Sequence, residues 1–142
     1  MKINLTQNKN FKLFKIISKV AQENNQTVYI VGGYVRDLLM QRKAPTDIDF
    51  VTEQSGIELA KAVGKELGDL KVSVFKTYGT AMIKYKDLDL EFVGARKESY
   101  SEDSRKPAVE TGTLEDDQKR RDFTVNALAI SLNAENFGEL ID

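Results

Sequence analysis

Two aspartates, Asp47 and Asp49, lie two positions apart in a segment that could bind a metal ion. Residues 47–51 alternate acidic and apolar side chains, which is typical of a half-buried strand. Alternate side chains of a strand share a face, so both carboxylates are expected to project together and to share one or two divalent ions. Mg2+ suits them because it prefers oxygen ligands and is often held by one or two carboxylates plus substrate phosphates. A solvated strand edge is the alternative for an isolated pair.

A second alternating segment, residues 88–92, carries Asp89 and Glu91 on the face opposite to its apolar side chains. If this strand pairs beside the first, one of these acids could complete a trio of carboxylates, and like charges so close would require a cation. Alternation does not decide between Glu91 and Asp89. A polar sheet face is again the alternative.

The pair Gly32-Gly33 lies between an expected strand and an expected helix. Glycine permits backbone conformations closed to other residues and lets a phosphate approach the amides of a helix N-terminus. Arg36 lies in the first turn of that helix, where its guanidinium could bind phosphate oxygens, and Asp37 could orient it. Most Gly-Gly pairs are plain turns, so this motif alone is weak.

A basic cluster, Arg120 and Arg121 followed by Asp122, precedes an apolar segment. Two guanidinium groups near a helix start favour an anion, and Asp122 could cap that helix. Asn126 lies four residues further, on the same helix face. A solvated cluster beside the acids of residues 115–117 is the alternative.

Hydrophobic periodicity predicts the elements that would position these residues. We expect a helix over residues 11–23 capped by Asn10, and a second helix over residues 34–41. We expect a third helix over residues 57–67, capped by Ser55 or Thr52.

The predicted strands cover residues 28–31, 47–51, 71–76, 80–85 and 88–95. Residues 96–113 are charged and interrupted by Pro107 and Gly112, so an exposed, mobile loop is expected. Residues 123–132 are expected to pass from helix into strand.

Composition limits the chemistry that is available. The 142 residues are 41% apolar and 30% charged, which suits one globular domain, and 21 Lys+Arg against 22 Asp+Glu give a net charge of -1. No Cys and no His are present, which excludes thiolate and imidazole chemistry and favours hard cations on carboxylates. With no apolar run long enough to span a bilayer, we expect a cytoplasmic protein.

Three motifs taken in order resemble the head domain of class II tRNA CCA-adding enzymes and bacterial poly(A) polymerases. They are residues 32–37 (Gly-Gly-Tyr-Val-Arg-Asp), residues 47–49 (Asp-Ile-Asp) and residues 120–128 (Arg-Arg-Asp-Phe-Thr-Val-Asn-Ala-Leu). The similarity runs from about residue 28 to the C-terminus, and the arginine motif is the most specific.

The resemblance implies an α/β (α+β) fold like that of DNA polymerase beta, a mixed sheet flanked by helices. It also implies two-metal transfer of AMP or CMP from ATP or CTP to the 3′-hydroxyl of tRNA or another RNA. The implied roles are two Mg2+ ions on Asp47 and Asp49 with Glu91 as third carboxylate, and nucleotide contacts from Gly32, Gly33 and Arg36. Arg121 matches the triphosphate-binding arginine, supported by Arg120, Asp122 and Asn126.

Family members continue into helical neck, body and tail regions that select the base and hold tRNA, so residues 1–142 are expected to be the catalytic head alone. The nucleotide choice, whether CCA, CC, A or poly(A), lies largely outside these residues. Two other classes share features with this sequence: a small-molecule nucleotidyltransferase, against which the arginine motif argues, and a nucleotide-binding module without turnover.

Overall fold

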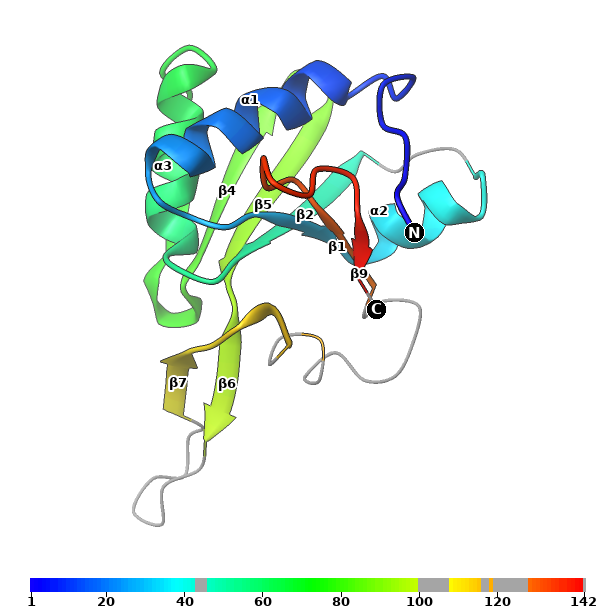
Figure 1. Cartoon of the computed structure of the whole chain (residues 1–142). Helices are drawn as coiled ribbons and strands as arrows, with labels where there is room; N and C mark the ends of the chain where they lie inside the picture. The colour runs from blue at the N-terminus through cyan, green and yellow to red at the C-terminus, as the bar shows by residue number, and fades with distance from the viewer. Residues whose placement is uncertain (43–45, 100–107, 116–117, 119–127, 142) are drawn as a thin grey trace.

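The computed structural model describes residues 1–42, 46–99, 108–115, 118 and 128–141. In chain order the elements are α1 (Phe11–Glu23), β1 (Tyr29–Val31), α2 (Gly33–Leu39), β2 (Asp47–Thr52), α3 (Gly56–Glu66), β3 (Val72–Phe75), the 3-10 helix η1 (Lys76–Tyr78), β4 (Thr80–Tyr85), β5 (Leu88–Gly94), β6 (Arg96–Ser99), β7 (Ala108–Thr111), β8 (Ala129–Ser131) and β9 (Leu140–Ile141). Seven strands form one sheet in the order β3-β4-β5-β2-β1-β8-β9, while β6 and β7 form a hairpin beyond it (Figure 1). Within the described residues, no helix is long and apolar enough to span a membrane.

The helices α1 and α3 cover one face of this sheet (Figure 1). Each helix is amphipathic, so its apolar stripe is buried against the sheet while its lysines face water. Phe14 and Ile17 of α1 and Leu59 of α3 are fully buried there. This layer is the main core, and the opposite face of the sheet carries the carboxylates together with a second, smaller buried cluster: Tyr29, Val31, Val51, Ala95, Leu114 and Ala129.

The strands β2 and β5 are parallel, whereas the other neighbouring strands of the described sheet are antiparallel. A parallel pair requires a crossover, which α3, β3 and β4 supply. Phe50 and Phe92 are register partners, and their rings stack on the helical side with centroids 5.0 Å apart. This buried contact fixes the relative position of the two strands.

The three predicted helices and the predicted strands are present, with small differences at their ends. Of the two caps proposed for α3, Ser55 is the one observed, since its side chain accepts a hydrogen bond from the Glu58 amide at 3.2 Å. Asn10 precedes α1 but makes no side-chain cap. Its buried amide instead donates to the Tyr34 hydroxyl at 3.1 Å, so the predicted capping role was wrong.

The loop predicted over residues 96–113 was also wrong in part, because Arg96–Ser99 pairs with Ala108–Thr111 in an antiparallel hairpin. The hairpin projects from the end of β5 (Figure 1). A two-stranded hairpin outside the main sheet does not need an alternating apolar pattern, so the charged composition of this segment predicted a loop and gave no signal for its strands. Of the predicted segment 123–132, β8 confirms the strand, and residues 123–127 lie outside the described residues.

Candidate active site

The four acidic residues of β2 and β5 lie on the sheet face opposite to α1 and α3. In the parallel register Asp47 is opposite Asp89, and Asp49 is opposite Glu91. The intervening Ile48 and Leu90 are buried in the helical core, so the acids must project from the other face. Asp47 is exposed and the other three acids are half-buried. The predicted shared face of Asp47 and Asp49 is therefore confirmed.

The Gly32-Gly33 turn lies directly against Asp49, because β1 pairs with β2 and Val31 is opposite Asp49. Gly32 has φ 79 and ψ -150, a conformation that is essentially restricted to glycine. A Cβ on Gly32 would lie 3.1 Å from Oδ2 of Asp49. Glycine at this position therefore gives the turn its shape and leaves room for the carboxylate.

Arg36 lies on the other side of the same turn. A Cβ on Gly33 would lie 3.3 Å from a terminal guanidinium nitrogen of Arg36, so the guanidinium rests against this glycine. Nε of Arg36 also donates to Oδ1 of Asp37 at 3.2 Å, as the sequence suggested. The turn thus has a carboxylate beside its first glycine and a cation beside its second. Because α2 has only seven residues, the partial positive charge at its N-terminus is small, and the Arg36 guanidinium is the larger positive charge at this turn.

Asp89 and Glu91 differ in their surroundings. Asp89 forms an exposed ion pair with Lys84, near the C-terminal end of β4, with 3.7 Å between Oδ1 and the ammonium nitrogen. Glu91 is the register partner of Asp49, which in turn lies beside Gly32. The register therefore favours Glu91 over Asp89 as the acid that belongs with Asp49 and the glycine turn.

The oxygen ligands available to a metal ion on this sheet face are the carboxylates of β2, with those of β5 on the neighbouring strand. Among the described residues, no group of three or more potential metal-ligating side chains lies close enough to hold an ion in this structure, so the role of Glu91 as the third carboxylate stays a prediction. Mutual repulsion of like charges on one face favours such separation. Asp47 and Asp49 nevertheless fit Mg2+, which needs only one or two carboxylates when substrate phosphates and water supply the remaining ligands.

The predicted arginine motif, namely Arg120, Arg121, Asp122 and Asn126, lies outside the described residues. Its relation to the carboxylates therefore remains a prediction from sequence.

Glu53, just beyond the end of β2, has a structural role that the sequence did not indicate. Its carboxylate accepts a hydrogen bond from the Leu114 amide at 2.9 Å and so holds the chain after β7 against the sheet. Burial, followed by the negative charge of Glu53, raises the pKa of Tyr29 above its ordinary value of 10.0. No local pattern could identify this contact, because Glu53 and Leu114 are far apart in sequence.

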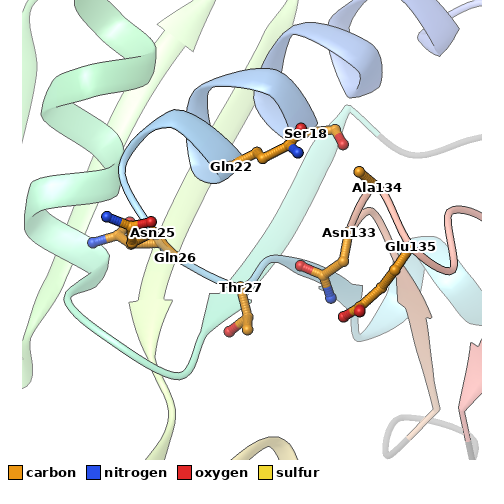
Figure 2. A pocket seen from close by; sticks show the side chains of 8 residues that line it. All are labelled: Ser18, Gln22, Asn25, Gln26, Thr27, Asn133, Ala134 and Glu135. Carbon is orange, nitrogen blue, oxygen red and sulfur yellow. The ribbon is translucent and has the colours of Figure 1, made fainter.

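A pocket of about 390 Å³ lies between α1 and the segment after β8 (Figure 2). It is lined by Ser18, Gln22, Asn25, Gln26, Thr27, Asn133, Ala134 and Glu135. These side chains are mainly amides and hydroxyls, and none is a predicted site residue. The pocket is therefore separate from the candidate active site.

Paired strand carboxylates beside a glycine turn on a mixed sheet are features of a nucleotidyltransferase domain. Comparison with protein families agrees: the family described as Poly A polymerase head domain matches residues 28–142. The chain is also 48% identical over 114 residues to an A-adding tRNA nucleotidyltransferase of Aquifex aeolicus, covering 80% of this chain and 14% of that protein. The chain therefore belongs to the poly(A) polymerase head domain family of nucleotidyltransferases.

Solved structures confirm the predicted fold. A tRNA-processing enzyme in an apo form matches with a TM-score of 0.84 and 40% identity, covering 100% of this chain and 34% of that one. A tRNA nucleotidyltransferase complexed with a primer tRNA and an incoming ATP analog matches with a TM-score of 0.75 and 43% identity, covering 89% of this chain and 34% of that one. The chain thus has the DNA polymerase beta-like fold and spans about a third or less of the relatives that it matches.

Proposed function

We propose that this chain is the catalytic head of a tRNA nucleotidyltransferase, which transfers AMP or CMP from ATP or CTP to the 3′-hydroxyl of tRNA. The observation that carries the proposal is the register of β2 and β5, which places Asp49 opposite Glu91 and beside Gly32. Family membership and the relative with a primer tRNA and an ATP analog support it. We place the reaction in the cytoplasm, with base selection and the tRNA grip in neck, body and tail regions beyond these residues.

In the proposed mechanism, Asp47 and Asp49 would hold two Mg2+ ions, with Glu91 as the third carboxylate. When bound, the ions supply charge neutralisation and ease loss of the proton from the attacking 3′-hydroxyl. The carboxylates of β2 and β5 share one sheet face and, with the ions that they would hold there, would bring the primer hydroxyl and the α-phosphate together. Such positioning is the main requirement of phosphoryl transfer, in which the attacking and leaving oxygens are in line.

The proposed nucleotide contacts come from the glycine turn and the arginine motif. Gly32 and Gly33 allow the phosphates to approach the backbone, and the Arg36 guanidinium forks onto phosphate oxygens, as guanidinium geometry permits. Arg121, supported by Arg120, Asp122 and Asn126, balances the negative charge that develops on the departing pyrophosphate. This second group of contacts rests on the family resemblance.

The test of the proposed function is Asp47→Asn in the full-length protein. Incorporation should fall by about 1,000-fold or more, because metal stabilisation of the developing charge contributes several kcal/mol. The assay uses Mg2+, labelled ATP or CTP, and tRNAs lacking one, two or three terminal nucleotides. Asp87→Asn, in the turn between β4 and β5, is the matched control because it removes an exposed acid outside the site.

A binding measurement separates loss of metal from loss of folding. Mg2+ should raise the midpoint of thermal unfolding of the wild type and of Asp87→Asn, but much less that of Asp47→Asn. Undiminished incorporation by Asp47→Asn would contradict the proposed role.

The same assay distinguishes the proposed function from its alternatives. Ordered addition of C, C and A identifies a CCA-adding enzyme. Extension with ATP alone identifies an A-adding enzyme or a poly(A) polymerase, and the number of A residues added separates these two. A protein that binds nucleotide without releasing pyrophosphate would instead be a binding module, and activity only on small acceptors would indicate a small-molecule nucleotidyltransferase.

A further inference from the structure

The segment from Leu70 to Lys86, which contains β3, η1 and β4, carries only basic charges, and the exposed Asp69 and Asp87 flank it. It contains four lysines and no acidic residue. Lys71, Lys76 and Lys86 are exposed, while Lys84 is close to Asp89. This local charge complements a polyanion, even though the composition of the whole chain does not.

Two aromatic rings are exposed in the same segment. Phe75 is 48% exposed and Tyr78 is 61% exposed, which makes them two of the four exposed large apolar side chains of the described structure. Phe75 faces away from the helices because its neighbours Val72 and Val74 pack against the helical core. Exposed aromatic rings combined with lysines are the side chains that bind single-stranded nucleic acid, since bases stack on the rings and lysines neutralise the phosphates.

The register places Phe75 on the face that carries the carboxylates. Phe75 is opposite Thr80, Thr80 is opposite Val93, and Val93 lies two residues beyond Glu91 on the same face of β5. Two strand spacings and two residues along a strand separate Phe75 from Glu91 by about 12 Å between their Cα atoms. That distance corresponds to about three or four stacked nucleotides.

We propose that Phe75, Tyr78 and Lys76 form a stacking surface for the primer RNA, which binds the unpaired nucleotides that immediately precede the 3′ end. This inference rests on the proposed function, because it assumes that the 3′-hydroxyl lies at the carboxylates. The rings hold the bases in any sequence, since every base presents a flat face. Lys76, which lies between Phe75 and Tyr78 in the sequence, contributes one phosphate contact.

The test measures RNA binding directly in the full-length protein. The probes are a labelled tRNA lacking its terminal A, and a short single-stranded RNA with 2-aminopurine at the third or fourth position from the 3′ end. Phe75→Ala and Tyr78→Ala should each raise the Kd for RNA by about 5- to 150-fold and lower the quenching of 2-aminopurine, because a stacking partner is lost. The Kd for ATP should stay within about twofold, since the proposed nucleotide contacts come from the glycine turn and the arginine motif and include neither ring.

Two further variants distinguish stacking and charge. Lys76→Ala should lower the slope of log Kd against log salt by about one, as expected when one phosphate contact is lost. Met40→Ala is the matched control, because Met40 is 53% exposed and lies outside this surface, and its Kd for RNA should not change.

The proposal is overturned if the double variant of Phe75 and Tyr78 binds RNA as the wild type does. It is also overturned if every ring variant that loses RNA affinity also has a lower melting temperature. That result is expected when the rings pack against another segment of the protein and their loss destabilises the fold. A wild type that binds RNA through these rings but transfers no nucleotide would support the surface and contradict the proposed function. The two proposals can therefore fail separately.

Discussion

Gly32 is the residue whose conformation most directly determines the geometry of the site. Its φ of 79 and ψ of -150 are costly for any L side chain, by about 1–3 kcal/mol. A Cβ would in addition lie 3.1 Å from Oδ2 of Asp49. The same substitution therefore strains the backbone and displaces a proposed metal ligand.

We predict that Gly32→Ala lowers the free energy of unfolding by about 1–3 kcal/mol and reduces nucleotide incorporation by more than the lost stability explains. Gly68→Ala is the control, because Gly68 also has a positive φ, 118, but has nothing within 4 Å of its Cβ position. Urea unfolding and the incorporation assay measure the two effects. Equal activity of the two variants would show that the contact with Asp49 does not matter.

Tyr29 allows a prediction about pH. Burial and the negative charge of Glu53 raise its pKa, so the folded chain retains the phenol proton where the unfolded chain loses it. The resulting stabilisation is complete below the unfolded pKa and is lost as the pH rises through the folded pKa. Above about pH 10, the free energy of unfolding of Tyr29→Phe should therefore decrease less with rising pH than that of the wild type.

Urea unfolding at pH 8 and at pH 11 tests this difference. Tyr78→Phe, which removes an exposed phenol, provides the comparison. An identical loss of stability in Tyr29→Phe and the wild type would contradict the assignment.

At the scale of elements, the β2–β5 pair depends on the stacked rings of Phe50 and Phe92 on its buried side. Phe92→Ala should lower the free energy of unfolding by about 3–5 kcal/mol, because it removes a fully buried ring and leaves a cavity. Phe92→Leu retains most of the volume and should cost less. Chemical denaturation measures both, and Mg2+-induced stabilisation reports whether the carboxylates remain aligned.

A loss below about 1 kcal/mol for Phe92→Ala would show that this contact does not hold the two strands together.

The elements that sequence predicted well are those with strong local periodicity. The helix α1 has the predicted bounds, and the alternation in β2 correctly placed Asp47 and Asp49 on one face. The hairpin of β6 and β7 was missed because its pairing is not encoded in an apolar pattern. Asn10 was assigned to a cap because local sequence could not indicate its contact with Tyr34.

At the scale of the whole molecule, the position of Glu91 beside Asp49 required tertiary structure. Alternation placed Glu91 and Asp89 on one face but could not supply the register between β2 and β5. The contact of Glu53 with Leu114 likewise joins distant segments. The family resemblance supplied the choice of Glu91 from motifs, and the register supplies an independent physical reason for it.

The parallel pairing of β2 with β5 also has a consequence for folding order. The two aspartates of β2 are synthesised before α3, β3 and β4, and β5 follows only after that crossover. Until β5 is in place, that side of β2 is an unpaired edge, and closing so long a connection is slow. Asp49 and Glu91 therefore become neighbours late in folding, and an ion held as proposed by acids of both strands would stabilise only chains in which the sheet is complete.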